Sequence, residues 1–189
     1  MKRLFPSLPP DATLGHVYRA FPEKLGPLAE YQNRVMRGDS ALSVAQRELI
    51  ATYVSGLNAC AFCYGAHKVH AKAFGVDIGI VDAMMTDLET ADIDDRMKPL
   101  LHYAGKLTTS PSRMTEADAQ AAYDAGWSEA ALFDAIQVAG VFNLMNRMLE
   151  GTGITEYYLD PETAAEDMLD GLRSKTCYAD FGRANGLFD

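Results

Sequence analysis

Residues 43–74 decide the fold, and they read SVAQRELIATYVSGLNACAFCYGAHKVHAKAF. Ser43 is followed three residues later by Gln46, which is the capping-box pattern of a helix start. Helical spacing then continues to a Gly-Leu-Asn break that ends at Asn58, so this part predicts one helix. Because Asn is a favoured N-cap residue, we expect Asn58 to open a second helix over residues 59–74. Two helices joined by so short a break predict a helix hairpin.

The rest of the chain carries helical spacing as well. A long helix follows the N-cap Ser128 and closes at Gly151-Thr152-Gly153, and its apolar residues occupy most of the circumference, as in a buried central helix. Shorter helices are expected over residues 14–20, 25–37, 78–88, 94–107 and 115–124. Because Val, Ile and Thr never alternate with polar residues over more than a few positions, no strand pattern competes. The fold class is therefore all-α.

The chain has 189 residues, of which 48% are hydrophobic, and this size suits one globular domain. We assign residues 1–155 to that domain. Residues 156–189 differ in sequence pattern, because one amphipathic stretch is followed by a tail interrupted by Gly and Asp. We interpret them as a C-terminal helical appendage and not as a separate domain. The appendage and the long apolar helix leave apolar surface for a neighbour, so we expect a homo-oligomer.

Charge and hydropathy narrow the range of partners. The chain has 17 Lys and Arg against 26 Asp and Glu, so its net charge of -9 repels polyanions and argues against nucleic acid. Pro6, Pro9 and Pro10 interrupt the only stretch that begins like a signal peptide. No stretch approaches the roughly 18 uninterrupted apolar residues of a membrane helix, so we expect no membrane partner and a cytoplasmic location.

The most informative residues are a close pair of cysteines, Cys60 and Cys63. A close pair in a reducing compartment indicates redox or metal chemistry more often than a structural disulfide. At about 100° per residue, His67 and His70 lie on the same helix face as both cysteines. The helix N-terminus favours a thiolate, and by itself this argument assigns the lower thiol pKa to Cys60.

Glu48 gains its interest from the hairpin geometry. It lies eight residues before the break and His67 lies eight residues after it, so each is about 12 Å from the turn. In an antiparallel pair they are level, provided that the break is a hairpin and not an elbow. The carboxylate then orients an imidazole that takes a proton from Cys63, one turn away, which is the arrangement of an activated nucleophile.

Other interpretations of these residues remain open. The two cysteines can be ordinary core residues, or they can form a zinc site with His67 and either His70 or Glu48. Covalent haem attachment is excluded, because it needs a His where Tyr64 stands. We expect His70 to be a polar residue at the rim of the site and Cys177, alone in the tail, to be a small packing residue.

The motifs together resemble a known family. They comprise Gln46 to Ala51 around Glu48, Asn58 to Cys63, His67, Leu101 to Leu107, Thr115 to Asp118, Gly126 to Ser128 and Phe142 to Arg147. This combination looks like the AhpD-like alkylhydroperoxidase family within the carboxymuconolactone decarboxylase superfamily, and more narrowly like its uncharacterised peroxidase-related branch. The likeness covers roughly residues 10–155.

The resemblance implies an all-helical, homo-oligomeric thiol peroxidase with its site near subunit contacts and with no metal or organic cofactor. Cys63 would attack a hydroperoxide, Cys60 would resolve the sulfenic acid to a disulfide, and Glu48 and His67 would relay the proton. An unidentified dithiol or protein reductant would restore the thiols. We follow this relay and assign the attack to Cys63, although the helix dipole favours Cys60.

The sequence departs from the best-known members at Phe62, where they carry a further His, so its site is more apolar. Phe62, Tyr64 and His70 are the candidates for supporting roles around the catalytic residues. Decarboxylase members of the superfamily lack the cysteine pair, which argues against lactone decarboxylation. The alternatives are a non-redox decarboxylase or isomerase that uses Glu48 and His67, and a metal-binding or structural oligomer.

Overall fold

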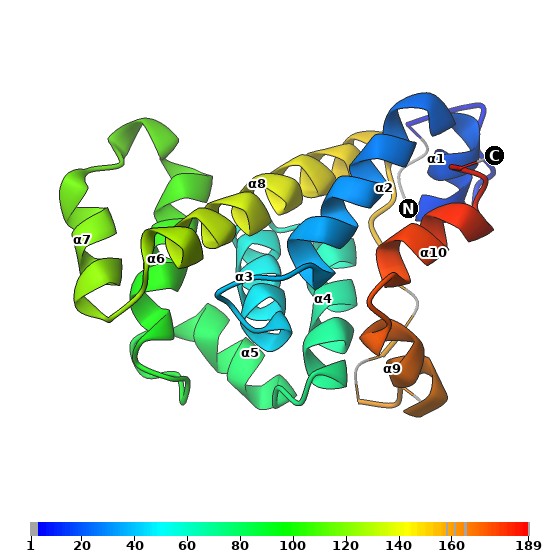
Figure 1. Cartoon of the computed structure of the whole chain (residues 1–189). Helices are drawn as coiled ribbons and strands as arrows, with labels where there is room; N and C mark the ends of the chain where they lie inside the picture. Colours follow the sequence, from blue (N-terminus) through cyan, green and yellow to red (C-terminus); the bar gives the residue numbers. More distant parts are fainter. Residues whose placement is uncertain (1–3, 158, 161, 165, 189) are drawn as a thin grey trace.

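The computed structural model describes residues 4–157, 159–160, 162–164 and 166–188, and within these ranges it contains helices and no strand (Figure 1). The all-α fold class is confirmed. The helices are α1 Leu14–Ala20, α2 Pro22–Arg37, α3 Val44–Leu57, α4 Ala61–Ala73, α5 Ile78–Thr86, α6 Met97–Thr109, α7 Glu116–Asp124, α8 Glu129–Thr152, α9 Glu166–Arg173 and α10 Cys177–Ala184, with a short 3₁₀ turn over Pro111–Arg113.

Helices α3 and α4 pack against each other and carry the candidate site. The capping box that opens α3 is present, since Gln46 N–H donates to Ser43 and the Gln46 side chain accepts from Ser43 N–H. The expected role of Asn58 is wrong, because Asn58 ends α3 and Cys60 is the N-cap residue of α4. The amide of Asn58 donates instead to Asn146 at 2.9 Å, which ties the link between the helices to α8.

Helix α8 runs along much of the length of the molecule (Figure 1). Ser128 caps its N-terminus by accepting from Ala131 N–H, and Gly153 ends it in the left-handed conformation with φ 83°. That conformation favours glycine, because an L side chain is strained there. One face of α8 packs on α3 and α6, while Phe133 and Leu144 point outward and are exposed. The helix is therefore central, but it is not covered all round.

The C-terminal segment contains two helices, α9 and α10, of which the sequence pattern did not predict α10. Helix α9 packs on α4, and α10 packs on α1 and α2, so the chain ends beside its N-terminal helices (Figure 1). The short α10 buries Ala179 and Gly182 against the domain. Within the described part of the chain, no helix has the length and apolar character needed to cross a membrane.

Candidate active site

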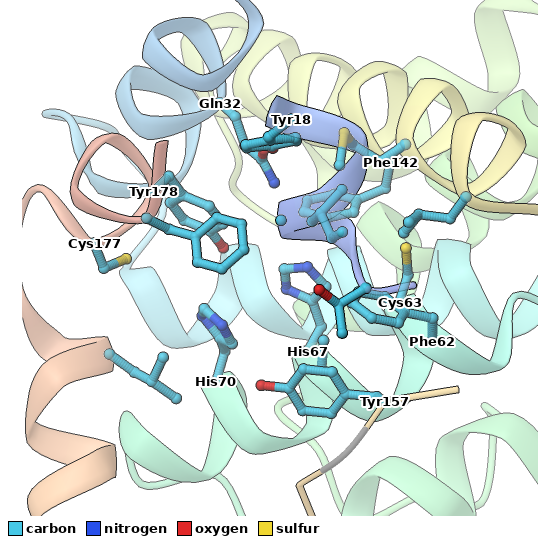
Figure 2. A pocket seen from close by; sticks show the side chains of 18 of the residues that line it. Tyr18, Gln32, Phe62, Cys63, His67, His70, Phe142, Tyr157, Cys177 and Tyr178 are labelled. Atoms are coloured by element: carbon cyan, nitrogen blue, oxygen red, sulfur yellow. The ribbon is translucent and has the colours of Figure 1, made fainter. Parts of the chain in front are cut away.

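Cys63, His67 and His70 lie on the wall of one cavity of about 360 Å³ (Figure 2). All three side chains come from α4, on the face that turns toward α8 and α10. Phe62 also lines the cavity and packs edge-on against the Tyr157 ring, with 5.2 Å between the ring centroids. Phe62, the position at which the sequence departs from the best-known members of the resembled family, therefore lies in the cavity wall and makes that wall more apolar.

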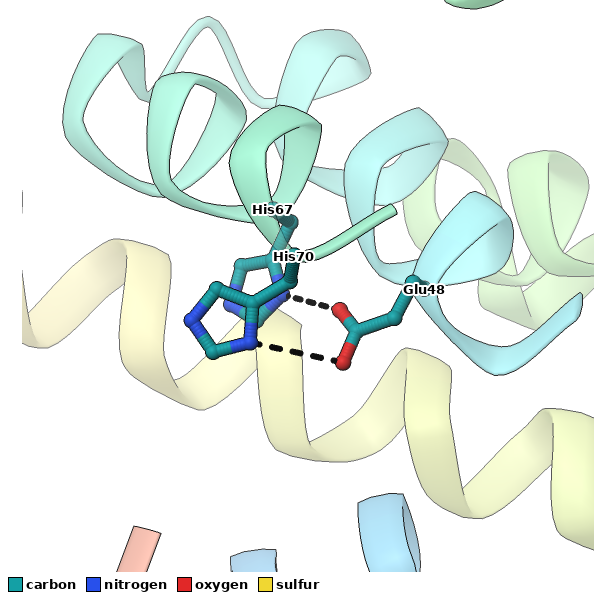
Figure 3. A group of neighbouring side chains, drawn as sticks. All are labelled: Glu48, His67 and His70. Atoms are coloured by element: carbon teal, nitrogen blue, oxygen red, sulfur yellow. Dashed lines mark hydrogen bonds and ion pairs between the residues drawn. The ribbon is translucent and has the colours of Figure 1, made fainter. Parts of the chain in front are cut away.

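Glu48 lies behind the two histidines, and its side chain is fully buried (Figure 3). The His67 Nδ1 atom is 2.7 Å from one carboxylate oxygen, Oε2. Because an ionised carboxylate only accepts hydrogen bonds, Nδ1 donates and the other ring nitrogen of neutral His67 keeps its lone pair. The structure therefore brings Glu48 and His67 together in the level arrangement that the helix rise predicts.

Arg37, the last residue of α2, completes this cluster. Its Nη1 atom donates to Glu48 Oε1 at 2.6 Å, and its Nη2 atom lies 3.1 Å from His70 Nδ1. The guanidinium carbon lies between two aromatic rings, 4.8 Å from the centroid of Phe74 and 5.0 Å from that of Tyr178. A single Arg at a helix C-terminus is ordinary in sequence, so no local signal distinguishes Arg37.

Burial and ion pairing together set the charges of the cluster. Burial alone would raise the pKa of Glu48, but His70 and His67 beside it hold that pKa well below its usual range. Burial lowers the pKa of His67, even though Glu48 opposes this shift. At neutral pH the cluster therefore holds an Arg37–Glu48 ion pair and an uncharged His67, which is the protonation state of a general base.

The two thiols are reduced, and the exposed fractions are 0% for Cys60 and 3% for Cys63. A hydrogen bond from Cys63 lowers the pKa of Cys60. The same hydrogen bond, together with burial, raises the pKa of Cys63. The negative charge of the pair is thus more stable on Cys60, as the helix-start argument predicts, whereas Cys63 is the thiol that opens into the cavity.

Cys60 and Tyr64 face another part of the molecule. They border a second, shallower hollow between α3, α4 and α5, beside Gly56 and Met85. The Tyr64 hydroxyl donates to Asp82 at 2.9 Å. Tyr64 therefore supports the packing of α5 on α4 and takes no part in the cavity around Cys63.

Of the expected relay from Cys63 through His67 to Glu48, the structure contains the hydrogen bond between His67 and Glu48. Among the residues that the structure describes, no hydrogen bond joins His67 to Cys63, although both border the same cavity. A hydroxyl group that occupies the cavity, such as that of a water or a hydroperoxide, can carry a proton between them.

Two expectations about single residues need correction or extension. His70 is not at the rim of the site, because it is buried against Arg37 and Glu48. Cys177 borders the cavity, and the next residue, Tyr178, donates its hydroxyl to Glu48 Oε1 at 3.3 Å. Tyr178 lies 130 positions from Glu48 in the chain, and no sequence pattern connects them.

A metal ion is the other candidate occupant of the cluster. Glu48, His67 and His70 each offer one ligand atom, and these three atoms lie within 4.8 Å of one another. Carboxylate and imidazole ligands suit zinc. However, Arg37 already binds Oε1 and His67 Nδ1–H binds Oε2. A divalent cation there would face a guanidinium, so the arrangement fits a charge-balanced hydrogen-bond network better than a metal centre.

Residues 22–106 match the carboxymuconolactone decarboxylase family. The matched segment is a little less than half of the chain. It contains Glu48, Cys60, Cys63 and His67, so the family resemblance that the motifs carry is confirmed. The family segment stops short of α8 and α10, and α1 precedes it.

Two solved structures are similar to this chain over about three quarters of its length. An uncharacterised peroxidase-related protein from Silicibacter sp. TM1040 is 29% identical, with a TM-score of 0.69, over 74% of this chain and 73% of that one. A peroxidase-related protein with an alkylhydroperoxidase AhpD core, from Ralstonia eutropha JMP134, is 24% identical, with a TM-score of 0.71, over 75% and 74% of the two chains.

A third structure shares the fold. It is a protein of unknown function from Agrobacterium tumefaciens, described as a candidate antioxidant defence protein AhpD, with 18% identity and a TM-score of 0.67 over 76% of this chain and 97% of that one. No curated protein sequence matches this chain.

Proposed function

We propose that the protein is a thiol peroxidase that reduces hydroperoxides through a Cys60–Cys63 dithiol–disulfide cycle. One observation carries the proposal: Cys63 and a His67 held by Glu48 border the same cavity, and a second thiol lies one helical turn from Cys63 outside it. The similarity to peroxidase-related proteins supports the same chemistry.

In the first step, His67 accepts the proton of Cys63 through a hydroxyl group in the cavity. The Cys63 thiolate then attacks the terminal oxygen of the hydroperoxide, so that an S–O bond forms and the O–O bond breaks. The sulfur is oxidised to a sulfenic acid, and the alkoxide that leaves takes the proton from His67. Glu48 contributes by orienting His67 and stabilising its protonated form.

In the second step, the Cys60 sulfur attacks the sulfenic sulfur of Cys63. The disulfide forms, and the hydroxyl leaves with the Cys60 proton as water. A dithiol or protein reductant then exchanges with the disulfide, is itself oxidised, and returns both thiols. The protein side of the cycle requires no metal or organic cofactor.

Cysteine variants test the proposal. Cys63→Ser should abolish peroxide consumption, because the attacking sulfur is gone. Cys60→Ser should consume one equivalent and stop as a sulfenic acid on Cys63, or proceed to a sulfinic acid, which mass spectrometry with a sulfenic-acid trap identifies. A trapped sulfenic acid on Cys60 in the Cys63→Ser protein would reverse the roles of the two thiols.

The same variants separate the proposal from non-redox chemistry. A decarboxylase or isomerase that uses Glu48 and His67 would retain activity in the Cys63→Ser protein. Wild-type protein that is fully reduced and consumes no hydroperoxide would overturn the peroxidase proposal.

A further inference from the structure

Two polar side chains in the cavity have no hydrogen-bond partner among the residues that the structure describes. Tyr18 from α1 is 3% exposed, Gln32 from α2 is 4% exposed, and both line the cavity that Cys63 borders. Within the described part of the chain, neither side chain makes a hydrogen bond, and neither is sealed from the cavity. Their polar atoms are open to the cavity, so whatever occupies it can form hydrogen bonds with them. A ligand that displaces water from this cavity must therefore offer a polar group that pairs with them.

The position of Tyr18 is set by the C-terminal helix. Arg19 donates to Asn185, and a Cβ on Gly15 would lie 2.3 Å from the Asn185 side chain, so α1 and the end of α10 are in close contact. The Tyr18 ring packs edge-on against Phe181, with 5.5 Å between centroids. Figure 2 shows Tyr18 and Gln32 together on the side of the cavity opposite Tyr157.

Tyr18 is also electrostatically linked to Cys63. Burial raises the pKa of Tyr18 to about 12, and the nearby Cys63 contributes to this shift. The Tyr18 hydroxyl therefore keeps its proton and acts as a hydrogen-bond donor at neutral pH. The Gln32 carboxamide supplies a second donor, and it carries no charge that would compete for the thiolate.

The rest of the wall is mainly apolar. Its large apolar side chains are those of Leu14, Phe62, Phe142, Met145, Leu149, Leu172 and Phe181. The cavity volume of about 360 Å³ is roughly twelve times the ~30 Å³ that one water occupies in the liquid. A ligand that satisfies this cavity has a hydrocarbon body and one small polar group directed at Tyr18 and Gln32.

We propose that Tyr18 and Gln32 bind the leaving oxygen of an organic hydroperoxide whose hydrocarbon group fills the cavity. This inference rests on the proposed peroxidase function. When Cys63 attacks the terminal oxygen, the O–O electron pair moves to the oxygen bonded to carbon, which becomes an alkoxide. Donors already aimed at that oxygen stabilise the developing charge until the proton arrives from His67. Hydrogen peroxide has no hydrocarbon group to hold it there.

Two conservative variants test the donors. Tyr18→Phe and Gln32→Leu each remove one donor while keeping the shape of the side chain. Each should lower kcat/KM for cumene hydroperoxide by about 10²-fold, as the loss of one preorganised oxyanion donor does elsewhere. The pH profile of Cys63 alkylation should not change, because the donors act on the substrate oxygen and not on the thiol. Wild-type protein should reduce cumene hydroperoxide faster than hydrogen peroxide.

Tyr31→Phe is the matched control, since this exposed tyrosine of α2 bonds to Gln137 outside the cavity. It should retain the wild-type rate. A second readout needs no turnover and uses 2-phenyl-2-propanol, the alcohol product of cumene hydroperoxide. Calorimetry should show that this alcohol binds to the Cys63→Ser protein about tenfold more tightly than to the double variant Cys63→Ser with Tyr18→Phe.

The outcomes separate the inference from the function on which it rests. An active wild-type enzyme with unchanged kcat/KM in both Tyr18→Phe and Gln32→Leu overturns the inference and leaves the peroxidase proposal standing. Inactive wild-type protein whose alcohol binding still depends on Tyr18 overturns the peroxidase proposal and supports the assigned ligand contacts. Equal alcohol binding with and without Tyr18→Phe counts against those contacts.

Discussion

Replacing Glu48 by Gln should separate its structural role from its chemical one. The carboxylate lies 2.6 Å from Arg37 Nη1 and 2.7 Å from His67 Nδ1, and it is fully buried. Gln keeps the shape but leaves the Arg37 guanidinium buried without a counter-charge, and breaking a buried ion pair in this way costs about 3–5 kcal/mol. For a chain of this size, each kcal/mol shifts Tm by about 2–4 °C, so Tm should fall by about 6–20 °C.

The double variant Arg37→Met with Glu48→Gln is the matched control. It removes both charges, so it should recover most of the stability that the single variant loses. Peroxide reduction at neutral pH should stay slow in both variants, because His67 has no carboxylate to orient it in either. General-base assistance is worth about 10²–10⁴-fold, and the loss of the orienting partner should cost part of that. The defect should shrink at higher pH, where Cys63 ionises without help.

Urea unfolding measures the stability of the single and double variants, and stopped-flow peroxide consumption measures their rates across pH. A single variant as stable as wild type, or a double variant less stable than the single one, would refute the assigned ion pair. Wild-type rates in Glu48→Gln at every pH would refute the relay and leave Glu48 with a structural role alone.

Two further predictions follow from the same structure. The folded pKa values of His67 and Glu48 lie below their ordinary values of 6.5 and 4.5, so the unfolded chain binds more protons and stability should fall as pH drops below about 6.5. His67→Asn should flatten the upper part of this fall in urea midpoints, and a wild-type midpoint that is level down to pH 4.5 would contradict the shifts. The protein should be a homo-oligomer through the outer face of α8, where Phe133 is 57% and Leu144 is 51% exposed. Light scattering should show dissociation when both become Glu, and a monomeric wild type at micromolar concentration would exclude this interface.

Local sequence signals were sufficient for the helices that position the candidate site. The Ser43 capping box and the Ser128 cap are patterns within four residues, and helix starts depend on the backbone groups of the first turn. The level placement of Glu48 and His67 follows from the constant rise of 1.5 Å per residue in two packed helices. These parts needed no knowledge of distant contacts, because regular backbone geometry carries them.

Only the tertiary structure decided which distant side chains meet at the site. Arg37, Tyr178 and Tyr18 come from α2, α10 and α1, and each looks like an ordinary surface or helix-end residue in sequence. Asn58 fits the sequence pattern of an N-cap, but its side-chain amide donates to the buried Asn146 of α8. Pairing that buried polar group outweighs the propensity for one cap. Where a helix lies and which face it buries depend on covering all apolar faces at once. That condition belongs to the whole chain, so no local stretch of residues reveals it.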